Sequence, residues 1–130
     1  LVGAGIKFFD TSDVYGYKSA EAGLSAEHLL GRFAEQNPTA PIVAAKYMPI
    51  LWTKFLIGGP WRAGRRAISK ALEMTLDRGG WAYVDLYQVQ LPFPYLGGMD
   101  AMAEGLARAF ERGLCRNVGV SNFNAKEVRK

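Results

Sequence analysis

Short apolar runs alternate with amphipathic segments along most of this chain. Four short segments are predicted to be strands: 6–10, 41–46, 83–89 and 116–120. The second and third are nearly continuous apolar runs, interrupted only by Lys46, Asp85 and Gln88. Such runs are typical of parallel β-strands, which in α/β proteins are usually buried on both faces. We therefore expect four strands of one sheet with packing on each side.

Between these runs, the apolar residues take up the spacing of a helix. Three helices are expected, over 25–33, 62–78 and 99–113. Ser25 is a favourable N-cap residue for the first helix, and Asn124 is one for a further helix near the end. Strands that alternate with helices pair in parallel through right-handed crossovers. The predicted fold class is therefore α/β.

The length of the chain narrows the architecture. Its 130 residues make one ordinary domain, and no segment resembles an interdomain linker. Four parallel strands cannot close an eight-stranded barrel, which takes about 250 residues. The expectation is either a small open sheet or one domain, 1–130, of about four β/α units from a larger barrel. We expect the second, with the barrel truncated at both ends.

Composition and charge argue against several classes of protein. The chain is 49% hydrophobic and 22% charged, as soluble globular proteins are, and no apolar run approaches the roughly 20 residues that span a bilayer. The net charge of +4 comes from dispersed basic residues, which argues against nucleic-acid binding. The N-terminal residues show no recognisable targeting segment, so the sequence does not distinguish a cytoplasmic from a plastid location.

The chain contains one cysteine, Cys115, and one histidine, His28. One of each cannot form an internal disulfide or the usual protein-ligated zinc site, so no metal is expected. The apolar neighbours of Cys115 predict a buried and inert thiol. His28 is expected on the surface of the first helix.

Ionisable side chains lie where the first two strands end. Asp10 ends the first strand, Tyr15 follows five residues later, and Lys46 ends the second strand. An ammonium beside a phenol favours the phenolate, and a carboxylate keeps the ammonium charged. Such a phenol can protonate a carbonyl oxygen while hydride reaches the carbon. On spacing alone, the alternative is that Asp10 caps a turn, Tyr15 packs and Lys46 is solvated.

Five segments resemble, in order, the motifs of the aldo-keto reductases. They are Gly5-Ile6-Lys7-Phe8-Phe9-Asp10-Thr11-Ser12-Asp13-Val14-Tyr15-Gly16, Ser25-Ala26-Glu27-His28-Leu29-Leu30-Gly31, Ala45-Lys46, Val84-Asp85-Leu86-Tyr87-Gln88 and Gly119-Val120-Ser121-Asn122-Phe123. The segment 29–33 most resembles the plant and algal chloroplast-type members.

The resemblance implies a (β/α)₈ barrel that binds NADPH and reduces aldehydes or ketones to alcohols. Tyr15 would then be the general acid, with Lys46 as the partner that makes it more acidic. Asp10 would pair with Lys46 beside the cofactor. Ser121 and Asn122 would hydrogen-bond the nicotinamide carboxamide. The implied partner is a small carbonyl compound, with neither nucleic acid nor membrane involved.

The chain departs from the family pattern at Gln90, which stands where a histidine is usual. A glutamine amide can donate a hydrogen bond to a substrate carbonyl, but it does not titrate. We expect reductase activity that is altered or weakened and still requires Tyr15. The alternative is an inactive or weakly active barrel that binds the cofactor and serves a regulatory or auxiliary role. Retention of Asp10 and Lys46 with Tyr15 argues against it.

Two further expectations concern how much of the cofactor this chain binds and what two aromatic loops do. In the family, residues from later strands and loops bind the cofactor phosphates. Residues 1–130 alone are therefore expected to bind only the nicotinamide end of the cofactor. They are also expected to leave the edges of the sheet unpaired. Aromatic residues in two loops, Trp52, Phe55, Trp61 and the stretch 93–95, either line an apolar substrate pocket or pack over the barrel top.

Overall fold

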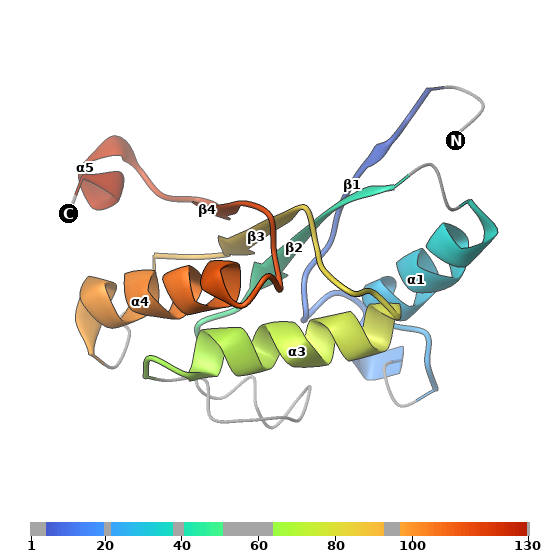
Figure 1. Cartoon of the computed structure of the whole chain (residues 1–130), viewed down its shortest axis with the longest axis horizontal. Coiled ribbons are helices and arrows are strands. Elements are labelled where there is room, and N and C mark those ends of the chain that lie inside the picture. Colours follow the sequence, from blue (N-terminus) through green and yellow to red (C-terminus); the bar gives the residue numbers. More distant parts are fainter. Residues whose placement is uncertain (1–4, 20–21, 38–40, 51–63, 93–96, 130) are drawn as a thin grey trace.

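A computed structural model describes residues 5–19, 22–37, 41–50, 64–92 and 97–129 (Figure 1). Strands and helices alternate along the chain, as the hydrophobic pattern predicts. The elements are β1 (Phe8–Asp10), the 3₁₀ turn η2 (Tyr17–Ser19), α1 (Ala26–Gln36), β2 (Ile42–Tyr47), α3 (Ala67–Gly79), β3 (Leu86–Val89), α4 (Gly98–Glu111), β4 (Val118–Val120) and α5 (Ala125–Val128).

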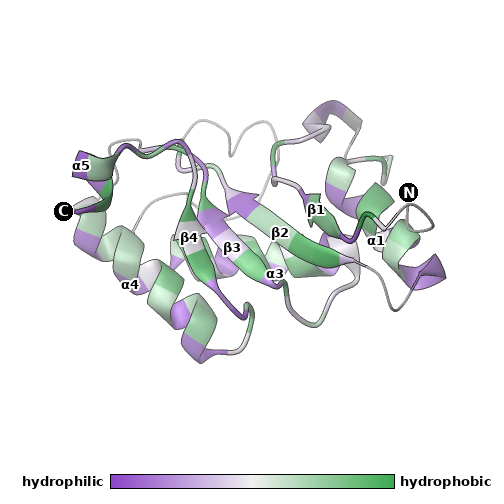
Figure 2. Ribbon diagram, turned by 90° about the horizontal axis from the view of Figure 1, so that it is seen from above, coloured by the Kyte–Doolittle hydropathy of each residue, from purple (hydrophilic) through white to green (hydrophobic). Residues whose placement is uncertain are grey.

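The four strands form one parallel sheet in the order β1-β2-β3-β4. Figure 2 shows them side by side in that order. The register places Asp10 opposite Ala44, and Lys46 opposite Gln88. Because all four strands run in one direction, their carboxyl ends lie along the same edge of the sheet. The loops that follow the strands are thereby brought together.

Three of the strands are shorter than the predicted segments, whereas β2 keeps its predicted length and is displaced by one residue, to 42–47. β1 begins at Phe8 rather than residue 6, β3 at Leu86 rather than 83, and β4 at Val118 rather than 116. Hydrophobic character marks burial, whereas a strand exists only where a neighbour is in register to bond it. Val84 illustrates the difference: it is fully buried, yet it makes only an isolated bridge to Cys115.

Helix boundaries also differ from the predicted ones. In the described residues, the helix expected over 62–78 begins at Ala67 and follows a turn, while residues 62 and 63 lie outside that part of the chain. Asn124 is the predicted N-cap of α5, and it forms a capping box with Glu127. Ser25 occupies the N-cap position of α1, but its hydroxyl bonds Nδ1 of the half-buried His28 at 2.7 Å instead of the backbone.

The core lies between one face of the sheet and the helices α1, α3 and α4, all of which cover that face in Figure 1. Its strand residues include Val43, Tyr47, Tyr87 and Val89, and its helix residues include Ile68, Leu72, Leu76, Met102 and Leu106. Burying each large apolar side chain stabilises the fold by about 1.5–3 kcal/mol. This layer therefore holds the strand ends in place.

The other face of the sheet is open in part: the expectation of burial on both faces holds for β2, where residues 43–47 are all buried, but not for β1 and β4. On that face Phe8 is 55% exposed, and its register partner Ile42 is exposed as well. Val118 and Val120 are also exposed, but they lie on the helix-covered face, opposite the core residues Tyr87 and Val89, in the edge strand β4. Strand order follows chain order, so each right-handed crossover advances in the same direction. Such winding puts every connecting helix on one side, which is the arrangement found in barrels.

The packing of α1 on α3 is close and partly polar. A Cβ atom at Gly31 would lie 2.3 Å from the carbonyl oxygen of Gly79, so the two backbones touch there. Glu27 is fully buried; it accepts a hydrogen bond from Thr75 Oγ1 at 2.9 Å and forms an ion pair with Arg78. Together these contacts fix the position of α1 against the helix layer.

No helix in the described part of the chain is long and apolar enough to cross a membrane.

Candidate active site

Three ionisable side chains meet at the carboxyl ends of β1 and β2. Lys46 forms an ion pair with Asp10, and its Nζ lies 5.5 Å from the centre of the Tyr15 ring. Lys46 is 7% exposed, whereas Tyr15 is 40% exposed. A buried ammonium is therefore held between a carboxylate and a phenol that solvent and ligands can reach.

The loop after β1 is bonded to the end of β2, and this is what presents Tyr15. The Thr11 amide donates to the Ala44 carbonyl at 2.8 Å, and the Asp13 amide donates to the Lys46 carbonyl at 3.3 Å. The carboxylate of Asp13, which is buried, accepts from the Met48 amide at 3.3 Å. Tyr15 thus follows a turn whose backbone is anchored to the strand that carries Lys46.

Gln90 joins this group from the end of β3. Its amide N–H donates to the Tyr47 carbonyl at 2.9 Å, which extends the strand pairing by one residue. Its side-chain oxygen accepts a hydrogen bond of 2.5 Å from the hydroxyl of Ser12, a fully buried residue. Because the Ser12 hydroxyl donates to the Gln90 side-chain oxygen, the NH₂ group of that side chain is available as a donor to another group.

Ser121 and Asn122 follow β4 at the same edge of the sheet. The Ser121 amide donates to the Val89 carbonyl at 2.8 Å, and Asn122 adopts a left-handed conformation with φ of 62°. Asparagine tolerates that conformation better than most residues. The side-chain NH₂ group of Asn122 donates to the backbone carbonyl of Gln90 at 2.8 Å and to Ser121 Oγ at 3.1 Å. This turn therefore places a hydroxyl and an amide beside Gln90.

All six residues singled out from the sequence thus lie at one edge of the sheet: Asp10, Tyr15, Lys46, Gln90, Ser121 and Asn122. The buried polar residues Ser12 and Asp13 had no assigned role, although both belong to the motif around Tyr15. Gln90 could have pointed to Ser12, because a glutamine in place of the family's usual histidine has a side-chain oxygen that requires a hydrogen-bond donor. Trp52, Phe55, Trp61 and 93–95 lie outside the described residues.

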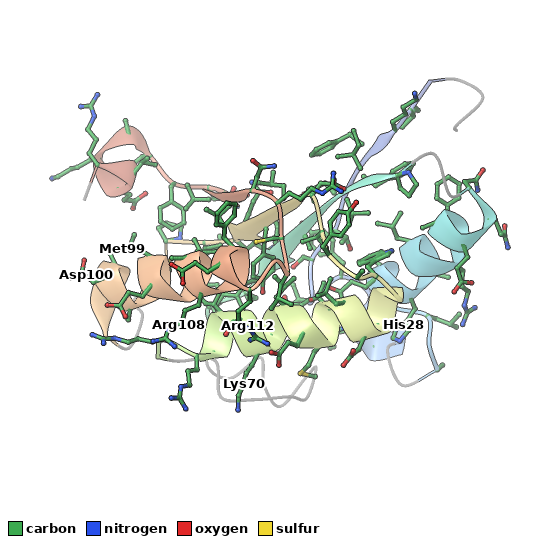
Figure 3. The ribbon with its side chains drawn as sticks, viewed as in Figure 1. His28, Lys70, Met99, Asp100, Arg108 and Arg112 are labelled. Carbon is green, nitrogen blue, oxygen red and sulfur yellow. The ribbon has the colours of Figure 1, made fainter. Side chains whose placement is uncertain are left out.

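The remaining candidates lie away from this edge. Cys115 is buried in the core, where it forms the bridge to Val84, and burial raises the pKa of its thiol to about 11 from its ordinary 9.0. His28 lies on α1, where Figure 3 labels it. Among the described residues, no group of three or more His, Cys, Asp or Glu side chains could hold a metal ion.

Chemically, the arrangement combines a reachable proton donor with a fixed positive charge. The Lys46 ammonium stabilises negative charge that develops on a neighbouring oxygen, because it is buried and already oriented by Asp10. Gln90 and Asn122 add amide groups that both donate and accept hydrogen bonds. Such a set suits proton transfer to a polar ligand group held at the edge of the sheet.

Comparison with known proteins adds named relatives. The chain is 32% identical over 130 residues to the 6-dehydroglucose reductase of Novosphingobium aromaticivorans, a match that covers 96% of this chain and 40% of that protein. It is 28% identical over 128 residues to the chloroplastic pyridoxal reductase of Arabidopsis thaliana, covering 97% of this chain and 34% of the relative. The chain therefore spans two fifths or less of these relatives' length.

Solved structures show the same architecture. An aldo/keto reductase from Klebsiella pneumoniae, in complex with NADP and acetate, superposes with a TM-score of 0.74 at 22% identity, over 98% of this chain and 38% of that one. The prediction of a partial (β/α)₈ barrel is thereby confirmed, and the single-sided helix layer is explained. The family model for aldo/keto reductases matches residues 1–130. From its motifs, its half-barrel and this match, the chain belongs to the aldo/keto reductase family.

Proposed function

We propose that this chain carries the proton-donor side of an NADPH-dependent carbonyl reductase site, with Tyr15 as the general acid. The observation that supports it best is the buried Lys46 ammonium, paired with Asp10 and close to the exposed Tyr15 ring. A purely structural ion pair would not need an accessible phenol beside it. The names of two curated relatives, a 6-dehydroglucose reductase and a pyridoxal reductase, agree with this reaction class.

Tyr15 delivers its proton to the carbonyl oxygen of the substrate. As that proton leaves, negative charge develops on the phenol oxygen, and the Lys46 ammonium stabilises it. Asp10 holds the Lys46 ammonium in place, so this group does not need to move when charge develops on the phenol oxygen. Positioned acids of this kind typically contribute about 10²–10⁴-fold to the rate.

Gln90 orients the carbonyl group that receives the proton. Its side-chain oxygen is occupied by Ser12, which leaves the NH₂ group as a donor for the substrate oxygen. The amide does not change charge with pH, unlike the histidine usual at this position. Ser12 is therefore a positioning residue that keeps the Gln90 amide in its donating orientation.

The residues after β4 suit the nicotinamide end of the cofactor. A carboxamide both donates and accepts hydrogen bonds. The Asn122 NH₂ group already donates to Gln90 and Ser121, so its oxygen would accept from the carboxamide and the Ser121 hydroxyl would donate to it. Asp10 borders the same edge of the sheet. When bound there, NADPH would supply the hydride, while Tyr15 supplies the proton. The substrates are small aldehydes or ketones.

The test is NADPH oxidation by the complete gene product with a panel of carbonyl compounds that includes pyridoxal. We expect Tyr15→Phe to lower kcat at least about a hundredfold without weakening NADPH binding. Tyr17→Phe is the matched control, because it removes a hydroxyl two residues away, and it should retain full activity. Undiminished turnover in Tyr15→Phe would exclude Tyr15 as the general acid.

A second candidate is a cofactor-binding barrel with a regulatory or auxiliary role. The observation that favours it is Gln90, whose oxygen is already bonded within the protein and which cannot relay a proton. The same assay separates the two. Tight NADPH binding without oxidation by any carbonyl compound would support the regulatory role over the reductase.

A further inference from the structure

The outer surface of the helix layer contains a pocket that the proposed reductase site does not use. It lies between α3 and α4, has a volume of about 300 Å³, and is lined by Arg66, Ser69, Lys70, Glu73, Arg108 and Arg112. Figure 3 labels Lys70, Arg108 and Arg112 where the two helices lie side by side. None of these residues belongs to the strand ends, so this is a separate feature of the molecule.

Two ion pairs between the helices bracket the pocket. Arg65, in the turn just before α3, pairs with Glu104 of α4 at 3.0 Å, and further along Glu73 of α3 pairs with Arg112, the C-cap residue of α4. On α4, Glu104, Arg108 and Arg112 recur at four-residue intervals and so share one face. Arg108 therefore lies between two ion pairs that join the helices, one with the carboxylate of Glu104 and one with that of Glu73.

Between these two ion pairs, the helices present three basic residues. Arg66 and Lys70 from α3 meet Arg108 from α4 in the pocket, and within the described residues none of the three has an ion-pair partner. Like charges so placed repel one another. The first turn of α3 contains no acidic residue, so its positive dipole end adds to the field of these cations. An anion seated between them would relieve this repulsion.

We propose that this pocket binds a phosphate group, either inorganic or on a phosphorylated small molecule. Arginine guanidinium groups match phosphate oxygens in two-point hydrogen bonds, and lysine adds a compact point charge. The three unpaired cations line one pocket of about 300 Å³, together with Ser69 and the Glu73–Arg112 ion pair, and a pocket of that size favours a compact anion over an extended acidic chain. The site lies beyond the proposed reductase activity and does not depend on it.

The experiment is a calorimetric titration of the complete gene product, free of NADPH and at low ionic strength. The probes are inorganic phosphate, pyrophosphate and glycerol 3-phosphate, which distinguish a free anion from a phosphomonoester. We expect saturable binding that weakens about tenfold in Lys70→Gln and in Arg108→Gln. Lys126→Gln is the matched control, because it removes one exposed cation from α5, and its affinity should equal that of the wild type.

Arg108→Glu provides a second test with a folded variant. It supplies the missing carboxylate between Arg66 and Lys70, so we expect a higher Tm without ligand and no phosphate binding. The proposal is overturned if no phosphate probe binds saturably, or if Lys126→Gln weakens binding as much as Lys70→Gln. It is also overturned if a poly-glutamate peptide binds while all three phosphate probes do not.

Discussion

The side chains of Ser12 and Gln90 meet at 2.5 Å although 78 positions separate them in the sequence. Ser12 follows β1 and is fully buried, and Gln90 follows β3. Their hydrogen bond spans the end of β2, where Lys46 lies. The residue that replaces the family's usual histidine is therefore held by a partner from the loop that carries Tyr15.

Ser12→Ala removes the partner of the Gln90 oxygen and leaves the amide free to turn. We expect KM for the carbonyl substrate to rise and kcat/KM to fall by about three- to tenfold, because one neutral hydrogen bond contributes about 1 kcal/mol. Steady-state kinetics measures this, with Ser69→Ala, a buried serine on α3, as the control. In a cycle with Gln90→Ala, strictly additive losses would show that Ser12 does not act through Gln90.

Gln90→His restores a titratable group to the site. We expect kcat/KM to gain an ionisation with a midpoint between about pH 6 and 7, where an ordinary histidine titrates. The measurement is the pH profile of kcat/KM for wild type and variant under the same conditions. If both proteins show the same profile, the side chain at position 90 does not contact the reacting carbonyl.

Glu27→Gln leaves Arg78 without its ion-pair partner inside the helix layer. Removing one partner of a buried pair costs about 3–5 kcal/mol, and Arg78 retains some access to water, so we expect a loss near the lower value. Urea denaturation measures the free energy of unfolding. Glu35→Gln, an exposed position on the same helix, should change it by less than about 0.5 kcal/mol. Equal effects at both positions would mean that the buried pair contributes no stability.

Gly31→Ala inserts a methyl group where α1 touches α3. The new Cβ atom would lie 2.3 Å from a backbone oxygen, so the helices must separate, and we expect a loss of about 1–3 kcal/mol or more. At Gly105 the nearest atoms belong to the Ile68 side chain, at 3.0 Å, so Gly105→Ala should cost less. Thermal denaturation ranks the two variants, and the reverse order would contradict the close contact of the backbones.

Cys115 is predicted to resist modification. Because burial raises its pKa from 9.0 to about 11, the thiolate fraction at pH 8 falls about a hundredfold, and the native protein should react with a disulfide reagent at least that much more slowly than the unfolded chain. The neutral thiol favours the folded state: its contribution is complete below pH 9 and declines as the pH rises toward 11. Cys115→Ala should remove that decline, and rapid labelling of the native protein would contradict the burial.

The amino-acid sequence by itself determined the order and type of the elements. Continuous apolar runs and helical spacing are local properties, so β1 to β4 and the intervening helices followed from them. It also indicated that Asp10 and Lys46 lie at the carboxyl ends of neighbouring strands, although β2 extends one residue beyond Lys46. The family motifs were also recognised from the sequence, whereas the roles of Tyr15 and its neighbours remain predictions.

Only the tertiary structure decided where each strand begins, which face of the sheet is covered and which side chains meet. Strand limits depend on register with a neighbour, as the isolated bridge at Val84 shows. The open face depends on crossovers that all advance in one direction. The Ser12–Gln90 bond and the unpaired cations around Arg108 join residues from different elements. Such contacts arise from packing in space, and no local pattern of polar and apolar residues contains them.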